Sequence, residues 1–164
     1  MCDYSLMGVP NRLAMEGEEL VTYRFSTGTI GLAPPAEVRK AREAQPPVRT
    51  GFWGFFREMF SSPVKPPVLA VCVPPGAHLM LADIPQGYQH ILDVGPTAAV
   101  TFTQISASAN THRDALRFED GRELLLQQLD EDQRVLVLDL SSADPRAPEI
   151  VERRPSFVLS FGLF

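Results

Sequence analysis

The chain has 164 residues, of which 45% are hydrophobic and 21% are charged, and its formal net charge is −5 at pH 7. A chain of this length can bury a full core as one domain, and its apolar fraction excludes disorder as a description of the whole molecule. The acidic balance excludes a general nucleic-acid-binding role, because neutralising phosphates requires a basic face.

The sequence contains no signal for export or for crossing a membrane. Its N-terminus lacks the basic stretch and the apolar run of a signal peptide, and no segment approaches the roughly 18 apolar residues of a membrane span. We therefore expect a cytoplasmic protein, with peripheral attachment to the inner membrane as an alternative.

Most of the chain has the residue pattern of β-strands. The expected strands are short runs rich in apolar and β-branched residues, separated by turn-forming residues. In chain order they are 20–25, 29–32, 68–73, 78–82, 89–94 and 98–105. A further alternating run at 157–164 predicts a last strand.

Residues 114–140 have the clearest strand signal. Three apolar runs, at 115–118, 123–129 and 134–140, are separated by short polar turns. The first turn contains Asp120-Gly121, which is typical of a tight hairpin. We predict that these three strands are successive neighbours in a β-meander. The whole pattern predicts a mainly β fold, an antiparallel sandwich or a small open barrel, as one domain over residues 1–164.

Residues 34–67 interrupt the strand pattern and contain seven of the fifteen prolines. We interpret them as a Pro-rich insertion that carries one or two short helices. Pro35 favours a helix start, and 36–44 follows as a helix that is polar nearly all round and therefore solvated. The insertion has a local charge of +3 in an otherwise acidic chain.

The second expected helix, residues 52–60, is the strongest interaction signal. Its bulky side chains fall within an arc of about 160° when they are placed at about 100° per residue. Prolines on both flanks keep the helix from extending. The apolar face consists of Phe52, Trp53, Phe55, Phe56, Met59 and Phe60.

Three fates are open for this apolar face. It can fold back over the β domain as a lid, dock on a partner protein, or lie in an anionic membrane surface. Three flanking cations, at Arg49, Arg57 and Lys65, are fewer than the 4 to 8 of a strong electrostatic membrane anchor, so we rank a protein above lipid. The expected role is a non-enzymatic accessory protein that docks on a larger protein assembly, and a membrane-bound assembly is one alternative. The predicted contact residues are Phe52, Trp53, Phe55, Phe56, Arg57, Met59, Phe60, Phe157, Phe161 and Phe164.

The chain contains two cysteines, Cys2 and Cys72, and we expect both to be thiols. If Met1 were removed, Cys2 would become an N-terminal residue whose α-amino group could act as the base for its own thiol. This enzymatic alternative lacks a recognisable oxyanion donor or substrate clamp. Cys72 lies in an apolar run and is expected to be a small core residue.

A metal site is the other chemical hypothesis that the sequence raises. His78, His90 and His112 could combine with nearby aspartates, and His112 and Asp114 would share one side of a strand. Their spacing matches neither the cupin pattern nor a zinc motif of paired Cys and His. We therefore predict no metal, no cofactor and no catalytic residue.

Three segments carry a family resemblance. They are residues 1–6 (Met-Cys-Asp-Tyr-Ser-Leu), 70–76 (Ala-Val-Cys-Val-Pro-Pro-Gly) and 112–118 (His-Arg-Asp-Ala-Leu-Arg-Phe). Together they resemble small bacterial proteins of uncharacterised function. The resemblance covers the β-rich parts and leaves out residues 34–67. It implies a bacterial source and an insertion added to an existing β domain, and it implies no activity.

Overall fold

The structure is a computed structural model, and it describes residue 6 and residues 8–44, 67–105 and 112–143. Within them, nine strands form one mixed sheet, accompanied by two α-helices and one 3-10 helix. The strands are β1 (Asn11–Leu13), β2 (Glu19–Arg24), β3 (Ile30–Ala33), β4 (Ala70–Cys72), β5 (His78–Leu81), β6 (Ala98–Gln104), β7 (Asp114–Phe118), β8 (Glu123–Leu125) and β9 (Arg134–Asp139). The helices are α1 (Pro35–Glu43), α3 (Gln86–Leu92) and the 3-10 helix η2 (Leu126–Gln128).

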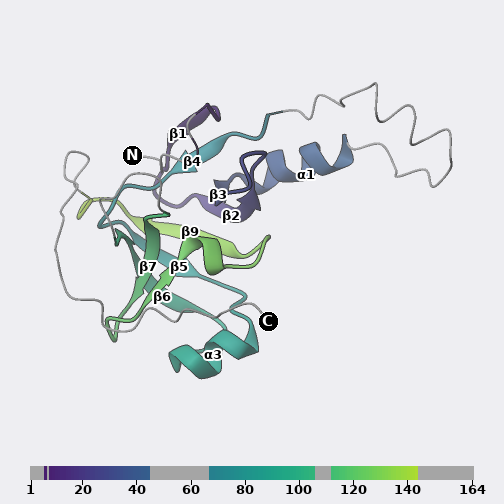
Figure 1. Cartoon of the computed structure of the whole chain (residues 1–164). Coiled ribbons are helices and arrows are strands. Elements are labelled where there is room, and N and C mark those ends of the chain that lie inside the picture. Colours follow the sequence, from purple (N-terminus) through teal and green to yellow (C-terminus); the bar gives the residue numbers. More distant parts are fainter. Residues whose placement is uncertain (1–5, 7, 45–66, 106–111, 144–164) are drawn as a thin grey trace, which may run out of the picture.

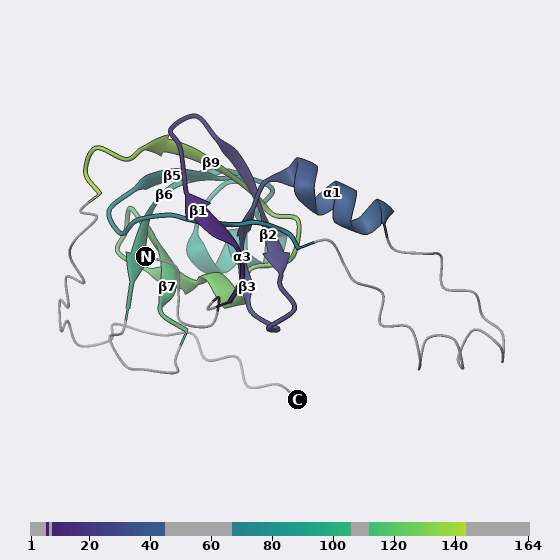
Figure 2. The ribbon, with the colours of Figure 1, turned by 90° about the horizontal axis from the view of Figure 1, so that it is seen from above.

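The strand order in the sheet is β1-β4-β3-β2-β9-β5-β6-β7-β8. All neighbouring strands are antiparallel except β1 and β4, which run parallel. The sheet curves around a common interior, as Figure 2 shows from above. A mainly β fold is therefore confirmed, and its sheet is antiparallel at every pair except β1–β4.

The side chain of Gln127 closes the curved sheet. Gln127 lies in η2, immediately after the edge strand β8, and η2 contacts β3. Its amide oxygen accepts from the backbone N–H of Ile30 at 2.9 Å, and its amide nitrogen donates to the carbonyl of Ile30 at 2.6 Å. One side chain thus makes the two bonds that a strand residue would make, and it links η2 to β3 across the curved sheet, which we call the barrel.

The interior of this barrel is filled by one large cluster of buried apolar side chains. Strands β5 and β9 alternate, so that Leu79 and Leu81 of β5 and Val135 and Val137 of β9 are fully buried. Helix α3 adds Leu92 to the same cluster, and Figure 1 shows α1 and α3 at different ends of the molecule. We call this cluster the barrel interior.

A second, smaller cluster lies on the other face of β2, β3 and β4, under α1. We call it the α1 flank. It consists of Leu6, Val21, Phe25, Ala33, Val38, Ala41, Val68 and Ala70. Helix α1 contributes Val38, which is 2% exposed, and Ala41, which is 3% exposed. The prediction that this helix is solvated all round is therefore wrong, because even two small side chains on one face suffice to seat a short helix on a sheet.

Several elements lie where the sequence predicts them. The strands expected at 20–25, 78–82 and 98–105 correspond to β2, β5 and β6, and the helix expected at 36–44 corresponds to α1. The Asp120-Gly121 turn joins β7 to β8, which pair as a hairpin. Gly121 has a φ of 85°, a conformation that glycine adopts without steric cost.

Residues 89–94, expected as a strand, belong instead to helix α3 and its end. Pro85 precedes the helix, and Asp93 ends it in the left-handed conformation with a φ of 50°. The guanidinium of Arg122, in the β7–β8 turn, donates to the carbonyls of Ile91 and Leu92 in the last turn of the helix. A distant cation therefore caps the C-terminus, where helix carbonyls lack partners.

The predicted β-meander is also wrong in its third strand. β8 pairs with β7, but β9 lies between β2 and β5, away from β8. The turn before β9 is fixed to β2, because the hydroxyl of Thr22 accepts from the N–H of Gln133 at 2.9 Å and donates to the carbonyl of Asp130 at 2.5 Å. Pairing in the centre of the sheet buries both Val135 and Val137, which an edge position would not achieve.

Candidate interaction surface at the base of the insertion

The predicted contact residues lie outside the described residues. They are Phe52, Trp53, Phe55, Phe56, Arg57, Met59, Phe60, Phe157, Phe161 and Phe164. The structure does describe the two ends of the insertion from which the segment 52–60 continues. These ends are α1, up to Ala44, and the returning chain from Pro67 to β4.

The strands on either side of the insertion are direct neighbours. β3 pairs antiparallel with β4, with Leu32 opposite Val71. A tight turn of two to five residues is sufficient to join such a pair. The chain instead uses all of residues 34–69 for the connection. The length of this segment therefore exceeds what the sheet requires.

Both ends of the insertion are fastened to each other. A carboxylate oxygen of Glu37, in the first turn of α1, accepts from the backbone N–H of Leu69 at 2.8 Å. Val68 is buried in the α1 flank beside Val38 and Ala41. The outgoing helix and the returning chain are thus held at one place on the barrel, which we call the insertion base.

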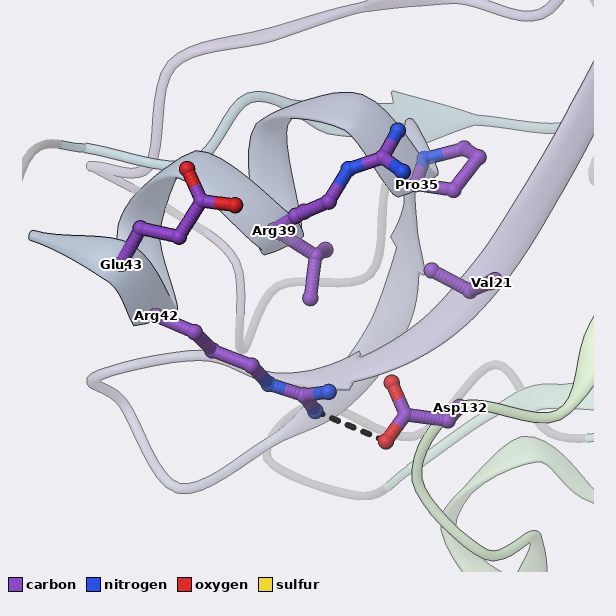
Figure 3. A pocket seen from close by; sticks show the side chains of 7 residues that line it. Val21, Pro35, Arg39, Arg42, Glu43 and Asp132 are labelled. Carbon is purple, nitrogen blue, oxygen red and sulfur yellow. Dashed lines mark ion pairs between the residues drawn. The ribbon is translucent and has the colours of Figure 1, made fainter.

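A groove opens between α1, β2 and the turn that precedes β9. Its volume is about 330 Å³. Figure 3 shows its side chains, with Arg42 of α1 reaching toward Asp132 of the turn. The two form an ion pair at 2.9 Å, and the hydrogen bond to Asp132 raises the pKa of Arg42. The groove is lined by Val21, Pro35, Val38, Arg39, Arg42, Glu43 and Asp132.

The charges around this groove balance. Arg39 and Arg42 are offset by Glu43 and Asp132, and the remaining lining is apolar. An apolar floor whose rim carries both positive and negative side chains is typical of a surface that contacts another protein. A surface that binds anionic lipid or phosphate instead carries more cations than anions. The groove contains no nucleophile and no histidine among its lining residues.

The histidines expected as possible metal ligands do not converge in the part of the chain that the structure describes. His78 stands opposite Asp139 across the β5–β9 pair, His90 lies in α3, and His112 precedes β7. Across all the residues that the structure describes, no group of three or more His, Cys, Asp or Glu side chains is placed so that it could hold a metal ion. Helices long and apolar enough to cross a bilayer are likewise absent from the described ranges.

Cys72 is disulfide-bonded, so the expectation that it is a thiol is wrong. Its predicted burial is confirmed, since it is 6% exposed in β4. The only other cysteine in the sequence is Cys2, which lies outside the described residues. A nucleophile at Cys2 requires a free thiol, so that hypothesis depends on the redox state of the protein.

Sequence reasoning missed Glu37 and Gln127, the side chains that fasten the insertion and close the barrel. Glu37 has the ordinary appearance of an acidic residue in a first helical turn, and Gln127 has that of a polar residue in the expected strand 123–129. Each acts on a backbone group far away in the chain, and no local pattern reports such a bond.

Comparison of the chain with protein-family models, with curated proteins and with solved structures finds no match.

Proposed function

We propose that this protein is a non-enzymatic accessory protein that docks on a larger protein assembly through the aromatic segment 52–60. The observation that supports this most directly is the insertion base. Neighbouring strands that need only a tight turn are joined by residues 34–69, and the bond from Leu69 to Glu37 fastens both ends of the connection. Long connections that the fold does not need are commonly functional.

The energetics favour docking by such a segment. Burying six bulky apolar side chains at about 1.5 to 3 kcal/mol each provides a gross term of about 10 kcal/mol or more. Binding also costs the ordering of the segment that docks. An insertion base fixed to the barrel reduces this cost, because the segment begins and ends at defined positions rather than on a free chain.

The charge balance of the neighbouring groove favours a protein over an anionic membrane. The described part of the insertion presents Arg39 and Arg42 together with Glu43, and Asp132 of the barrel completes the rim. The chain leaves α1 at the rim of this groove, so a partner that docks on the segment following α1 could contact both. An apolar side chain of that partner, framed by polar groups of both signs, would fit it.

Affinity capture with the full-length protein tests this proposal. The double variant Trp53→Ala/Phe56→Ala removes two anchors from the segment and is expected to abolish co-purification of a stoichiometric partner from the native source. A matched control is Leu13→Ala/Met15→Ala, which removes two side chains that are 64% and 61% exposed, in the edge strand β1 and just after it. The control is expected to retain the partner.

The melting temperature of the isolated protein separates docking from internal burial. Under the proposal the double variant melts at the wild-type temperature. A fall of many degrees would mean that segment 52–60 completes the core of its own chain, which contradicts the proposal. Flotation with anionic vesicles that depends on Trp53, without capture of any protein, would also contradict it and favour the membrane alternative.

A further inference from the structure

The outer side of the neighbouring strands β5 and β9 carries large apolar side chains, and Figure 1 shows these two strands side by side. On β9 the residues alternate, so that Leu136 and Leu138 point away from the barrel interior, and they are 39% and 43% exposed. Met80 of β5 stands opposite Leu136 on the same side and is partly buried. An antiparallel sheet that faces water on one side usually has polar residues there. These three residues, which we call the β9 patch, depart from that pattern.

The β9 patch is continuous, because its members are neighbours across the strands. Side chains that stand opposite each other in an antiparallel pair lie about 5 Å apart. The row through Met80 and Leu136 continues to the exposed Ala99 of β6 on one side and to Glu19 of β2 on the other. Leu138 lies beside this row, two residues further along β9. Single exposed leucines are ordinary, whereas a contiguous exposed apolar group indicates a contact site.

The charged groups that border the β9 patch are mostly acidic. Arg134 lies two residues before Leu136 on the same side of β9, and its guanidinium donates to the carboxylate of Asp83 at 2.5 and 3.1 Å. This ion pair leaves no surplus of positive charge. At the other end of the patch, Asp139 stands opposite His78. Among the described residues, the bordering groups are Arg134, His78, Glu16, Glu19, Asp83 and Asp139. Carboxylates therefore outnumber cations around the patch.

We propose that the β9 patch binds a partner protein through a segment that presents apolar side chains flanked by lysine or arginine. The apolar side chains of that segment cover Leu136, Leu138 and Met80, and its cations face the carboxylates that border the patch. Charge complementarity of this kind sets partner choice and speeds encounter. The inference goes beyond the proposed function, because the patch lies on the barrel itself and does not depend on segment 52–60.

The acidic border also decides against other occupants. An anionic membrane and a nucleic acid carry charge of the same sign as the border and are repelled by it. A second copy that docks patch to patch brings two acidic borders together, which is unfavourable for the same reason. A basic, partly apolar protein segment is the occupant that satisfies both the apolar side chains and their surroundings.

A synthetic peptide of alternating leucine and lysine is the probe for this proposal. It carries a fluorescent label, is titrated with the full-length protein and is followed by fluorescence anisotropy. Peptides of alternating leucine and glutamate, and of alternating serine and lysine, are the controls. We expect the leucine–lysine peptide to bind at least about tenfold more tightly than either control, and increasing salt to weaken it. Equal binding of the leucine–lysine peptide and either control would overturn the proposal.

Variants of the protein locate the binding. Leu136→Thr/Leu138→Thr keeps residues that suit a strand, and it should weaken binding of the leucine–lysine peptide by about tenfold. The matched control Leu13→Thr/Ile91→Thr changes two other exposed apolar side chains, in β1 and α3, and should bind as the wild type. Equal binding of the wild type and Leu136→Thr/Leu138→Thr would place the contact elsewhere and overturn the proposal.

Charge reversal tests the acidic border without touching the apolar side chains. Glu19→Lys should weaken the leucine–lysine peptide by several-fold, whereas Glu119→Lys makes the same change in the exposed β7–β8 turn and should not. Trp53→Ala/Phe56→Ala should bind this peptide as the wild type does, so the two proposals can fail separately. A wild-type dimer in sedimentation that becomes monomeric in Leu136→Thr/Leu138→Thr would overturn this proposal and assign the patch to a second copy.

Discussion

The barrel and the insertion base are each closed by a side chain that bonds a backbone group distant in the chain, but the two bonded backbone groups differ in burial. At the barrel, Gln127 bonds both backbone groups of Ile30, a residue that is buried in the sheet. At the insertion base, Glu37 bonds one backbone N–H, that of Leu69, in a partly exposed position. The first clamp replaces strand pairing inside the fold, and the second fastens a connection that is longer than the pairing of β3 with β4 requires.

This difference in burial predicts how much folding free energy is lost when each clamp is removed. A buried backbone group without a partner costs its full desolvation, whereas water can replace a bond at the surface. The barrel should therefore fail as a whole when its clamp is removed. The insertion base should fail locally and leave the barrel interior folded.

The largest effect is expected for Gln127→Ala. The change leaves the N–H and the carbonyl of Ile30 without their partners, at about 1 to 3 kcal/mol for each group, so the free energy of unfolding should fall by about 3 kcal/mol. Urea unfolding followed by far-UV circular dichroism measures it. The variant Gln127→Glu keeps the acceptor for the N–H of Ile30 but sets a carboxylate oxygen against the carbonyl of Ile30, so at neutral pH it should also destabilise the protein. Equal stability of the wild type and Gln127→Ala would show that water satisfies Ile30 and that the barrel needs no clamp.

A smaller and local effect is expected for Glu37→Ala. Loss of the bond from the N–H of Leu69 should cost about 1 kcal/mol and speed amide exchange in α1 and at Leu69, with the urea midpoint of the barrel nearly unchanged. Glu37→Gln retains an acceptor oxygen and should behave almost as the wild type. A cooperative loss of the whole fold on Glu37→Ala would mean that the insertion base and the barrel form one unit, and the distinction between the two clamps would fail.

The smallest effect concerns a third clamp, at the β1–β2 turn, and it depends on pH. The Glu18 carboxylate pairs with Arg12 and accepts from the N–H of Met15 at 3.1 Å, with 13% of its side chain exposed. The hydrogen bond to Arg12 lowers the pKa of Glu18 in the folded protein. The stabilisation is therefore present above the unfolded pKa, about 4.3, and is lost as pH falls through the lower folded value.

Measuring the free energy of unfolding at a series of pH values between 7 and 2 tests this third clamp. Glu18→Gln should remove one component of the acid loss, worth below about 1 kcal/mol for a pair near the surface. Identical profiles of the wild type and Glu18→Gln would show that the Arg12 pair adds nothing to stability.

Local signals in the chain predicted several elements of the fold correctly. Pro35 marks the start of α1, and Asp120-Gly121 marks the β7–β8 hairpin, since both act through the conformation of their own backbone. The candidate site was predicted as the segment 52–60, and it remains a prediction because those residues lie outside the described ones. The sequence did predict the setting of this segment, which is a Pro-rich stretch between two strands. It did not predict that these two strands, β3 and β4, pair with each other.

The amino-acid sequence by itself determined that this is a mainly β protein with a long Pro-rich connection between two of its strands, because alternation, turn residues and proline act over a few neighbouring positions. Only the tertiary structure decided that β9 lies in the centre of the sheet, that residues 89–94 end a helix capped by Arg122, and that Cys72 is bonded. These outcomes depend on groups that are far apart in the chain and meet only after the sheet has curved. The clamps at Gln127 and Glu37 belong to the same class, since a side chain that bonds a distant backbone leaves no periodic trace in the sequence.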